Sequence, residues 1–275
     1  LIRESLSRAG ANEVLTYSFV HKNVMERAAQ DISQAFQLSN ALSPELQYYR
    51  LSVLPSLLDK VHANIKGGYD EFALFEIGKA HNKKDHATDD SGLPSEMELL
   101  DVIYASKTPK TGAPYYHVRR LVTQLARDLG FTLKFTPADG AMDYPLTAPF
   151  ELTRSAMATS RKGEFIGIIG ELKQSVLKNF KLPDYTAAMS LDLKGLVNAH
   201  AAAGATYAPL SRFPSVTQDI SLKVMSDISY EDTFWAAYEA ITATAGAGYD
   251  IMATPLSIYQ GSDNNSKTIT LRIKV

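Results

Sequence analysis

Two segments of the chain carry apolar residues at helical spacing. Residues 53–65 and 115–129 each predict an amphipathic helix, and glycine follows both, as Gly67-Gly68 and as Gly130. The apolar positions are Val53, Leu57, Leu58, Val61 and Ile65 in the first helix and Val118, Leu121, Val122, Leu125 and Leu129 in the second. Each stripe is expected to pack on a core while the opposite side stays in water.

Alternating or continuous apolar runs predict strands around these helices. The predicted strands are residues 13–19, 36–39, 71–80, 97–105, 152–159, 164–171 and 187–193. Short helices are expected over residues 1–9 and 174–180, an exposed loop over 82–95 and a hairpin loop over 160–163. Ser43-Pro44-Glu45 predicts either a turn or the start of a helix.

The pattern of apolar and polar positions weakens over residues 198–205, which are small and mostly alanine. Beyond them it restarts as a strand (215–225), a helix (229–245, with Ser229 as its N-cap), a strand (249–259), a turn (261–265) and a strand (267–275). We therefore predict two α+β domains, residues 1–205 and 206–275. The β-α-β-β order opens a ferredoxin-like fold, which continues with a helix and a fourth strand, so the second domain is expected to be incomplete.

Composition narrows the class of protein. The 275 residues are 45% hydrophobic and 21% charged, with a formal net charge of -2 and no cysteine. A cysteine-free chain has no disulfide, thiolate nucleophile or cysteine-bound metal. No apolar run reaches the length of a membrane helix and no secretory segment opens the chain, so a cytoplasmic protein is expected. Since Leu1 stands where an initiator Met would, we also expect a piece of a longer chain.

The usual catalytic signatures are missing. The six histidines show no metal-ligand spacing, and the polar stretch around Asp85, His86, Asp89 and Asp90 predicts a solvated loop, so no metal ligand is assigned. The run GEFIGIIG (163–170) superficially resembles a phosphate loop, but its glycine spacing is wrong and no Gly-Lys-Ser/Thr follows. A hairpin turn followed by closely packed strand glycines is the favoured interpretation.

Several segments, taken in order, resemble the β subunit of bacterial phenylalanyl-tRNA synthetase. They are YSFV (17–20), LSNALSPELQYYRLSVLPSLLDKVHANIKGG (38–68), EFALFEIGKAH (71–81), LTRSAMATSRKGEFIGIIGEL (152–172), SRFPSVTQDISLKV (211–224), LSIYQG (256–261) and KTITLRIKV (267–275). The resemblance implies a class II synthetase-like antiparallel sheet flanked by helices, then a truncated ferredoxin-like anticodon-binding domain. It also implies a phenylalanine–tRNA ligase of two α and two β subunits that uses ATP and Mg²⁺ and binds tRNA, with no membrane association.

The residues indicate that the first domain lacks ATP chemistry of its own. Class II enzymes hold ATP phosphates with arginines on a strand and at a helix start. The strand 72–80 carries Glu76 and Lys79 but no arginine, and Glu171 follows Gly170; Arg154 is the remaining candidate. We therefore assign no catalytic residue and no cofactor here, and the resemblance leaves the active site to the α subunit.

Residues of the first motif are candidates for subunit contact or for scaffolding. They are Asn40, Ser43, Pro44, Arg50, Leu54, Pro55 and Glu76. For Leu54, Leu57 and Leu58 a place in the core of the domain is the favoured alternative, and for Asn40 and Arg50 the two interpretations are balanced. Glu76 lies in an apolar strand, so a structural ion pair is expected.

The second domain is a weak general RNA binder by charge, because residues 207–275 hold five basic and seven acidic side chains. A tRNA contact there needs a local patch, for which Arg212, Phe213, Tyr259, Lys267 and Arg272 are the candidates. Gln218 and Gln260 stand where the family carries arginine and often a basic residue. Two alternatives stay open: a stand-alone RNA-binding or interaction module, and a free-standing synthetase-like ligase.

Overall fold

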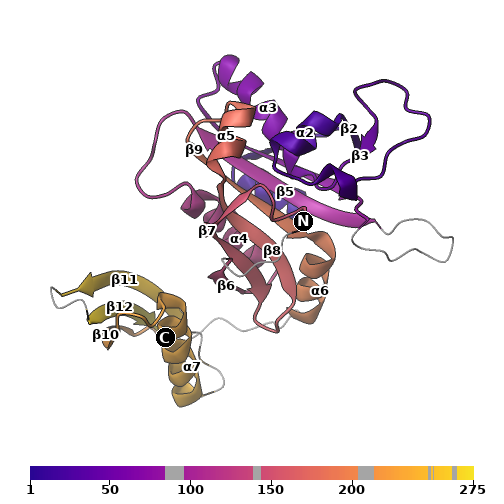
Figure 1. Ribbon diagram of the computed structural model, residues 1–275. Coiled ribbons are helices and arrows are strands. Elements are labelled where there is room, and N and C mark those ends of the chain that lie inside the picture. Colours follow the sequence, from indigo (N-terminus) through magenta and orange to yellow (C-terminus); the bar gives the residue numbers. More distant parts are fainter. Residues whose placement is uncertain (84–95, 139–143, 204–213, 247–248, 250, 262–264) are drawn as a thin grey trace. The chain divides into compact units, whose positions relative to one another are not determined.

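The chain divides into two compact units, Leu1–Ala205 and Thr206–Val275 (Figure 1). The computed structural model describes residues 1–83, 96–138, 144–203, 214–246, 249, 251–261 and 265–275. Each unit has its own sheet and its own core. The two units are therefore described separately.

The first unit is built on a seven-stranded sheet in the order β1-β4-β5-β9-β8-β7-β6. Its strands are β1 (Ala11–Glu13), β4 (Glu71–Ala80), β5 (Met97–Ser106), β6 (Leu133–Pro137), β7 (Phe150–Ser160), β8 (Phe165–Leu172) and β9 (Tyr185–Asp192). The pairing of β1 with β4 is parallel, and the other pairings are antiparallel. The predicted antiparallel α+β sheet flanked by helices is confirmed.

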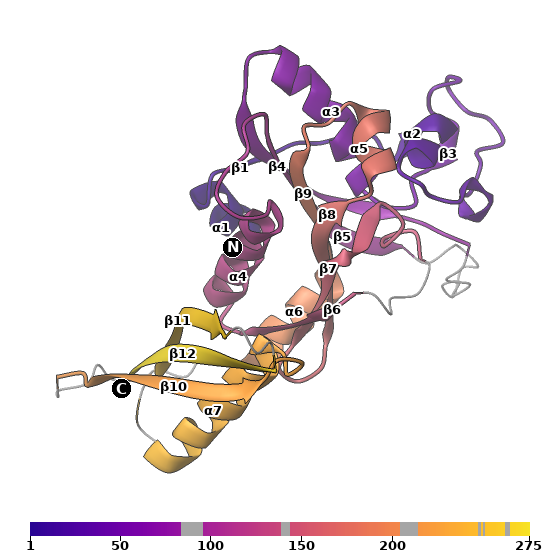
Figure 2. The same cartoon turned by 60° about the vertical axis from the view of Figure 1, so that its left-hand side comes forward.

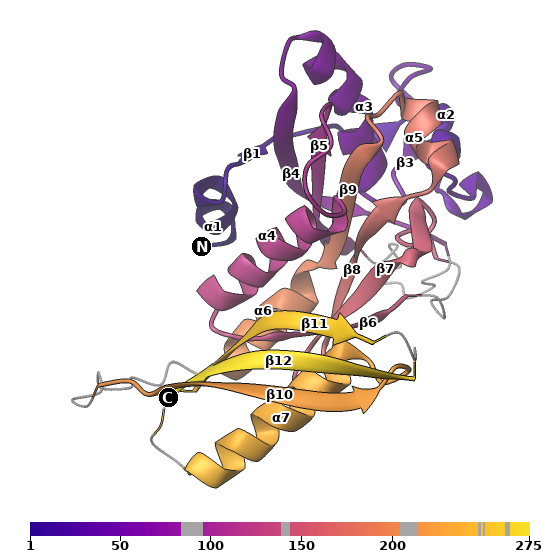
Figure 3. The same cartoon turned by 90° about the vertical axis from the view of Figure 1, so that its left-hand side faces the viewer.

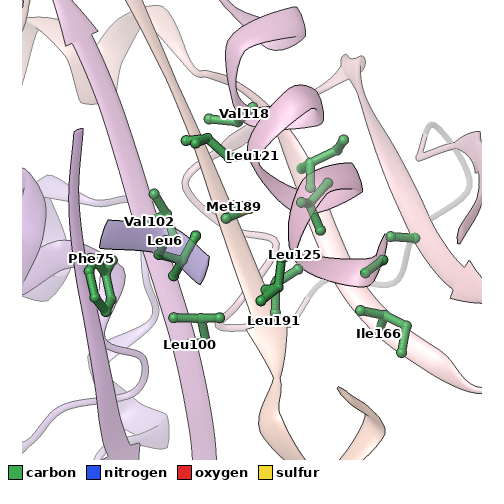
Figure 4. Close-up of a cluster of buried hydrophobic side chains, with 14 of the residues drawn as sticks. Leu6, Phe75, Leu100, Val102, Val118, Leu121, Leu125, Ile166, Met189 and Leu191 are labelled. Atoms are coloured by element: carbon green, nitrogen blue, oxygen red, sulfur yellow. The ribbon is translucent and has the colours of Figure 1, made fainter. Parts of the chain in front are cut away.

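Helices α1 (Ile2–Arg8), α4 (Tyr115–Asp128) and α6 (Leu193–Ala203) cover one face of this sheet. In β5, the even-numbered residues Leu100, Val102 and Tyr104 point into this layer. Figure 4 shows Val118, Leu121 and Leu125 of α4 over the strands. The stripe predicted from spacing is thus the buried side of α4.

Helices α3 (Leu54–Lys66) and α5 (Gln174–Phe180) cover the opposite face, and α2 (Lys22–Arg27) packs against these two helices (Figure 2). The odd-numbered residues of β5, Leu99 and Ile103, point into this second layer together with Leu57 and Leu58 of α3. Because the sheet is buried on both faces, the sequence of β5 is an almost continuous run of apolar residues.

Two of the strands predicted from the sequence, residues 13–19 and 36–39, are wrong. Residues 13–19 form β1 and β2 (Phe19–Val20) with irregular backbone between them, because Thr16 turns to bond side chains from elsewhere in the fold. Residues 36–39 make only a single bridge, from Gln37 to Tyr48. The sequence pattern also missed α2, a 3-10 turn (Ile32–Gln34), β3 (Tyr48–Tyr49) and β6, which are short. The Ala-rich segment continues as helix α6.

The second unit contains β10 (Thr217–Met225), α7 (Tyr230–Ala245), β11 (Met252–Gln260) and β12 (Ser266–Lys274). The strands pair antiparallel in the order β10-β12-β11, so β10 and β11 run parallel with β12 between them (Figure 3). Helix α7 covers one face, over Ile269, Leu271 and Ile273. The predicted N-cap is confirmed, since the Ser229 hydroxyl accepts the Asp232 N–H at 3.0 Å.

Every helix in the described residues is too short or too polar to cross a bilayer. The predicted loop over 82–95 lies outside the described residues from position 84 onward, as does most of the turn over 261–265.

Candidate functional site

A row of polar side chains crosses the middle of the seven-stranded sheet. Glu76 on β4, Asp101 on β5 and Ser190 on β9 are register partners, so their side chains share the face covered by α3. All three residues are at most 1% exposed. Buried polar groups in an otherwise apolar layer require partners, and the fold supplies most of them.

Arg50 places its guanidinium over this row. The residue directly follows β3, and its backbone is held by bonds to Ser18 and His81. Its Nη1 donates to Glu76 Oε1 at 2.9 Å, and the two side chains are 3% and 1% exposed. The ion pair expected for Glu76 is confirmed.

Three further hydrogen bonds surround the ion pair and hold its two side chains in place. Arg50 Nη1 also donates to the Thr16 hydroxyl at 2.9 Å, Arg50 Nε donates to the Lys79 carbonyl at 2.9 Å, and Thr16 donates to Glu76 Oε2 at 2.6 Å. A Cβ on Gly78 would lie 2.2 Å from Arg50 Nη2, so a side chain at this position would displace the guanidinium from its present place. The Phe-Glu-Ile-Gly pattern thus encodes both the carboxylate and the space beside it.

Asp101 is the least satisfied member of the row. Its Oδ1 accepts the Ser190 hydroxyl at 2.6 Å, while Oδ2 has no hydrogen-bond partner among the described residues. Complete burial raises the pKa of Asp101 to about 7, against the lowering effects of the Ser190 hydroxyl and of the Arg50 charge. The carboxyl group therefore changes its protonation state near neutral pH.

This arrangement does not fit an ATP phosphate. Arg50 supplies positive charge at the centre of the sheet, but Glu76 neutralises it, and the pair is enclosed by protein. Arg154 on β7 bonds Glu171 at 2.9 Å, so it is also paired. Within the described residues no group of three or more His, Asp or Glu side chains could hold a metal ion.

The glycines after the hairpin are packed against neighbouring strands. A Cβ on Gly167 would lie 2.2 Å from the Ser190 carbonyl oxygen, and one on Gly170 would lie 1.9 Å from Ser155 Oγ. The interpretation of GEFIGIIG as strand glycines rather than a phosphate loop is confirmed.

The predicted interface residues fall in two environments. Leu54 and Pro55 open α3 and are buried, with Leu57 and Leu58, in the core of the unit, which was the favoured alternative for the leucines. Asn40, Ser43 and Pro44 lie in the loop between the Gln37–Tyr48 bridge residues, and Asn40 and Pro44 are exposed. The Ser43 carbonyl accepts the Leu46 N–H at 3.1 Å, so Ser43-Pro44-Glu45 forms a turn.

Sequence reasoning missed the apolar residues that this part of the unit leaves in solvent. Leu42, in the same loop, is 96% exposed, and Leu15 and Tyr17, between β1 and β2, are 90% and 74% exposed. Single exposed apolar side chains are common on protein surfaces, and only a contiguous patch of them marks a surface that meets another protein. Single positions in a loop carry no periodic signal, so the pattern alone could not find them.

A second polar cluster lies on the other face of the sheet. Tyr104 stacks on His117 with ring centroids 4.2 Å apart, and its hydroxyl donates to Glu71 at 2.8 Å. Hydrogen bonds from Lys110 and Tyr104 lower the pKa of Glu71, while burial lowers the pKa of His117 and raises that of Tyr104. The cluster ties β4, β5 and α4 together and holds no activated nucleophile.

In the second unit the candidate tRNA residues are divided between faces. Tyr259, 69% exposed, and Arg272 lie on the open face of the sheet, away from α7. Arg272 makes a bidentate pair with Asp219 at 2.8 and 2.9 Å. Lys267 lies on the opposite face, where its ammonium group bonds the Ser226 carbonyl at 3.0 Å. The structure thus does not bring Lys267 together with the other two, and Arg212 and Phe213 lie outside the described residues.

Known proteins share both sequence and fold with this chain. The family model described as the phenylalanyl tRNA synthetase beta chain CLM domain matches residues 1–193. The phenylalanine–tRNA ligase beta subunit of Staphylococcus epidermidis is 27% identical over 290 residues, covering 99% of this chain and 33% of that protein. The beta subunit of Bacillus licheniformis is 28% identical over 268 residues, covering 94% and 31%. The chain thus spans about a third of the length of these relatives.

Solved structures agree on the fold. Prolyl-tRNA synthetase of Giardia lamblia, in complex with prolyl-adenylate, superposes with a TM-score of 0.54 at 9% identity, covering 72% of this chain and 43% of that chain. Pyrrolysyl-tRNA synthetase of Desulfitobacterium hafniense gives 0.53 at 13% identity, covering 73% and 68%. The seven-stranded sheet therefore resembles the catalytic domains of class II synthetases.

Proposed function

The chain belongs to the phenylalanyl-tRNA synthetase β-chain family, and we propose that it serves as a non-catalytic scaffold of phenylalanine–tRNA ligase. In this role it binds the α subunit, within a tetramer of two α and two β subunits, and helps to position tRNA. The ligase attaches phenylalanine to its tRNA with ATP and Mg²⁺, and the α subunit carries that chemistry.

The observation that supports a non-catalytic role is the closed Arg50–Glu76 pair. A synthetase sheet needs open cationic groups at its centre to bind ATP phosphates. Here the guanidinium is neutralised and 3% exposed, so a phosphate would have to displace Glu76 from a buried pair. Neither ATP nor Mg²⁺ fits this place, and no reaction step is assigned to it.

ATP–pyrophosphate exchange tests this directly. The isolated chain, supplied with phenylalanine, ATP and Mg²⁺, is expected to show no exchange above a heat-denatured control, while the α subunit assembled with an intact β subunit does. Phenylalanine-dependent exchange by the isolated chain would instead establish the free-standing ligase.

The exposed loop that carries Asn40, Leu42, Ser43 and Pro44 is the proposed contact with the α subunit. Its support is the coincidence of the family motif with the 96% exposed Leu42. Co-expression with a tagged α subunit, followed by affinity capture, is the test. Failure to recover a stable complex would favour the stand-alone interaction module.

The second unit is proposed to be a ferredoxin-like anticodon-binding domain. Its β10-α7-β11-β12 order and β10-β12-β11 sheet match the first three strands of a split βαβ fold. The open face offers Tyr259 for stacking, and Arg272 adds positive charge next to Asp219. Since this unit is acidic overall, the contact is proposed to support tRNA binding rather than to dominate it.

A further inference from the structure

Helices α2, α3 and α5 of the first unit pack against one another, and Arg27 of α2 joins all three (Figure 2). Its Nη1 donates to Asp59 of α3 at 3.0 Å, and its Nε donates to the Asn179 carbonyl of α5 at 3.1 Å. The Asn179 side chain donates back to the Arg27 carbonyl at 3.1 Å, and the guanidinium carbon lies 4.0 Å from the centre of the Phe180 ring. These contacts hold the outer surface of the three helices in one arrangement.

This helix layer is strongly basic, although the whole chain has a net charge of -2. The three helices and the two residues that cap α5 carry seven Lys or Arg and two Asp or Glu side chains, a net charge of +5. Asp59, one of the two carboxylates, already lies 3.0 Å from Arg27 and 3.6 Å from Lys60. The other five cations form no ion pair with a described residue, and they are Lys22, Lys66, Lys173, Lys178 and Lys181.

The same surface offers little to a protein partner. Every large apolar side chain of the three helices is buried or half-buried, and those of α3 and α5 pack into the core below. Protein interfaces are built around apolar and aromatic side chains and are depleted in lysine. A nucleic-acid backbone, in contrast, is bound largely through its charge, and lysine ammonium groups bind phosphates as point charges. A surface of unpaired lysines therefore fits a chain of phosphates better than it fits a protein.

We propose that the layer of α2, α3 and α5 binds the phosphate backbone of tRNA, which rests on the proposed role of the chain in positioning tRNA. The second unit holds five basic and seven acidic side chains, so its own electrostatic attraction to RNA is weak. The basic helix layer of the first unit supplies that attraction. Phosphates are the same at every position of an RNA, so this contact is independent of base sequence.

Filter binding of tRNA to the full chain, repeated between about 50 and 300 mM KCl, tests the surface. Lys178→Gln with Lys181→Gln removes two exposed charges from α5 and its C-cap. It should weaken binding about five- to fiftyfold near 0.1 M salt and lower the slope of log affinity against log salt by about 1 to 2.

The matched control removes two exposed charges elsewhere in the same unit. Lys134→Gln with Lys194→Gln changes β6 and α6, and it should alter the affinity less than about twofold. Thermal unfolding of both double variants should coincide with that of the wild type, because all four side chains are exposed. Equal losses of affinity for the two double variants, or no binding of tRNA by the wild type at the lowest salt concentration, would overturn the proposal.

The choice of tRNA tests the kind of contact. A tRNA for another amino acid should lose as much affinity for the Lys178→Gln, Lys181→Gln variant as the phenylalanine tRNA does, since phosphate contacts weaken binding uniformly across sequences. A loss confined to the phenylalanine tRNA would replace the backbone contact by a contact with bases.

Affinity capture with a tagged α subunit separates this surface from the proposed scaffold role. The Lys178→Gln, Lys181→Gln variant should be recovered with the α subunit as fully as the wild type. Loss of the α subunit with unchanged tRNA affinity would make the helix layer a protein contact. Full recovery of the α subunit with unchanged tRNA affinity would overturn the tRNA surface alone and leave the scaffold role standing.

Reductive methylation of lysines gives a readout that needs no substitution. Bound tRNA should slow the modification of Lys178 and Lys181 and leave that of Lys134 and Lys194 unchanged, as measured by mass spectrometry of the digested chain. Equal modification of all four lysines with and without tRNA would place the contact elsewhere.

Discussion

Arg50 and Glu76 form an ion pair of 2.9 Å at the centre of the larger sheet, with side chains 3% and 1% exposed. They are 26 residues apart in the sequence and meet through the β3–α3 connection and β4. Hydrogen bonds with the Thr16 hydroxyl and the Lys79 carbonyl hold the pair closed, and in the proposed role it leaves no free positive charge at this place for an ATP phosphate. It therefore links the stability of this unit to its proposed lack of ATP chemistry.

Removing one partner of this pair should be strongly destabilising. Arg50→Met leaves Glu76 buried without its cation and should lower the free energy of unfolding by about 3–5 kcal/mol. Arg50→Met combined with Glu76→Leu should recover part of that loss, because no charge then stays buried. Arg154→Met is the matched control at a pair whose arginine is 67% exposed, and it should cost about 0–1 kcal/mol. Urea unfolding of the wild type and the three variants measures these losses, and an equal loss for Arg50→Met and Arg154→Met would contradict the assignment.

Asp101 should give the chain a distinctive pH dependence. Its pKa is about 7 in the folded chain and near 3.8 ordinarily, so the folded state binds this proton more tightly. The stability that this group contributes is fully present below about pH 4 and is lost as pH rises through about 7. The unfolding free energy of the wild type minus that of Asp101→Asn should therefore fall between pH 4 and pH 8, by an amount on the order of a few kcal/mol.

Asp219→Asn provides a control of opposite sign. Hydrogen bonds from Arg272 lower the pKa of Asp219, so its contribution is present above its ordinary value of 3.8 and is lost as pH falls through the lowered pKa. The unfolding free energy of the wild type minus that of Asp219→Asn should thus rise with pH below about 4 and stay constant from pH 5 to pH 8. A flat difference for Asp101→Asn over the same interval would show that this carboxyl is not the titrating group.

Gly170 should tolerate no side chain. A Cβ there would lie 1.9 Å from Ser155 Oγ and 2.8 Å from Ser155 Cα, so the paired strands β7 and β8 would have to separate. Gly170→Ala should cost about 1–3 kcal/mol or more in thermal or urea unfolding. Gly67→Ala, at the end of α3, meets its nearest atoms at 3.3 Å and should cost less. Similar costs for both would argue against close packing of the strand glycines.

Tyr259 should contribute more to the affinity for tRNA than Lys267 does. Tyr259→Ala removes an exposed aromatic ring from the open face and, in the assembled ligase, should weaken tRNA binding roughly five- to hundredfold. Lys267→Met alters the helix-covered face and should change binding less than about twofold. Filter binding at a fixed salt concentration measures both. Loss of affinity in the lysine variant alone would move the proposed contact to the other face.

Regular periodicity made much of the fold predictable. The stripes of α3 and α4 and the apolar runs of β4, β5, β7, β8 and β9 are long enough to show their period. The β2–β3 pair and the strand β6 span two to five residues, so no pattern could reveal them. The need for a partner at Glu76 was predictable from a carboxylate in an apolar strand, whereas the row through Asp101 and Ser190 depends on strand register.

By itself the sequence determined the fold class, the family resemblance, the lack of cysteine and the net charge of -2, because composition and local period carry that information. Tertiary structure alone decided which side chains meet. It brought Arg50 to Glu76 and separated Lys267 from Tyr259. These relationships depend on which strands pair and in what register, and both are set by packing between segments far apart in the chain.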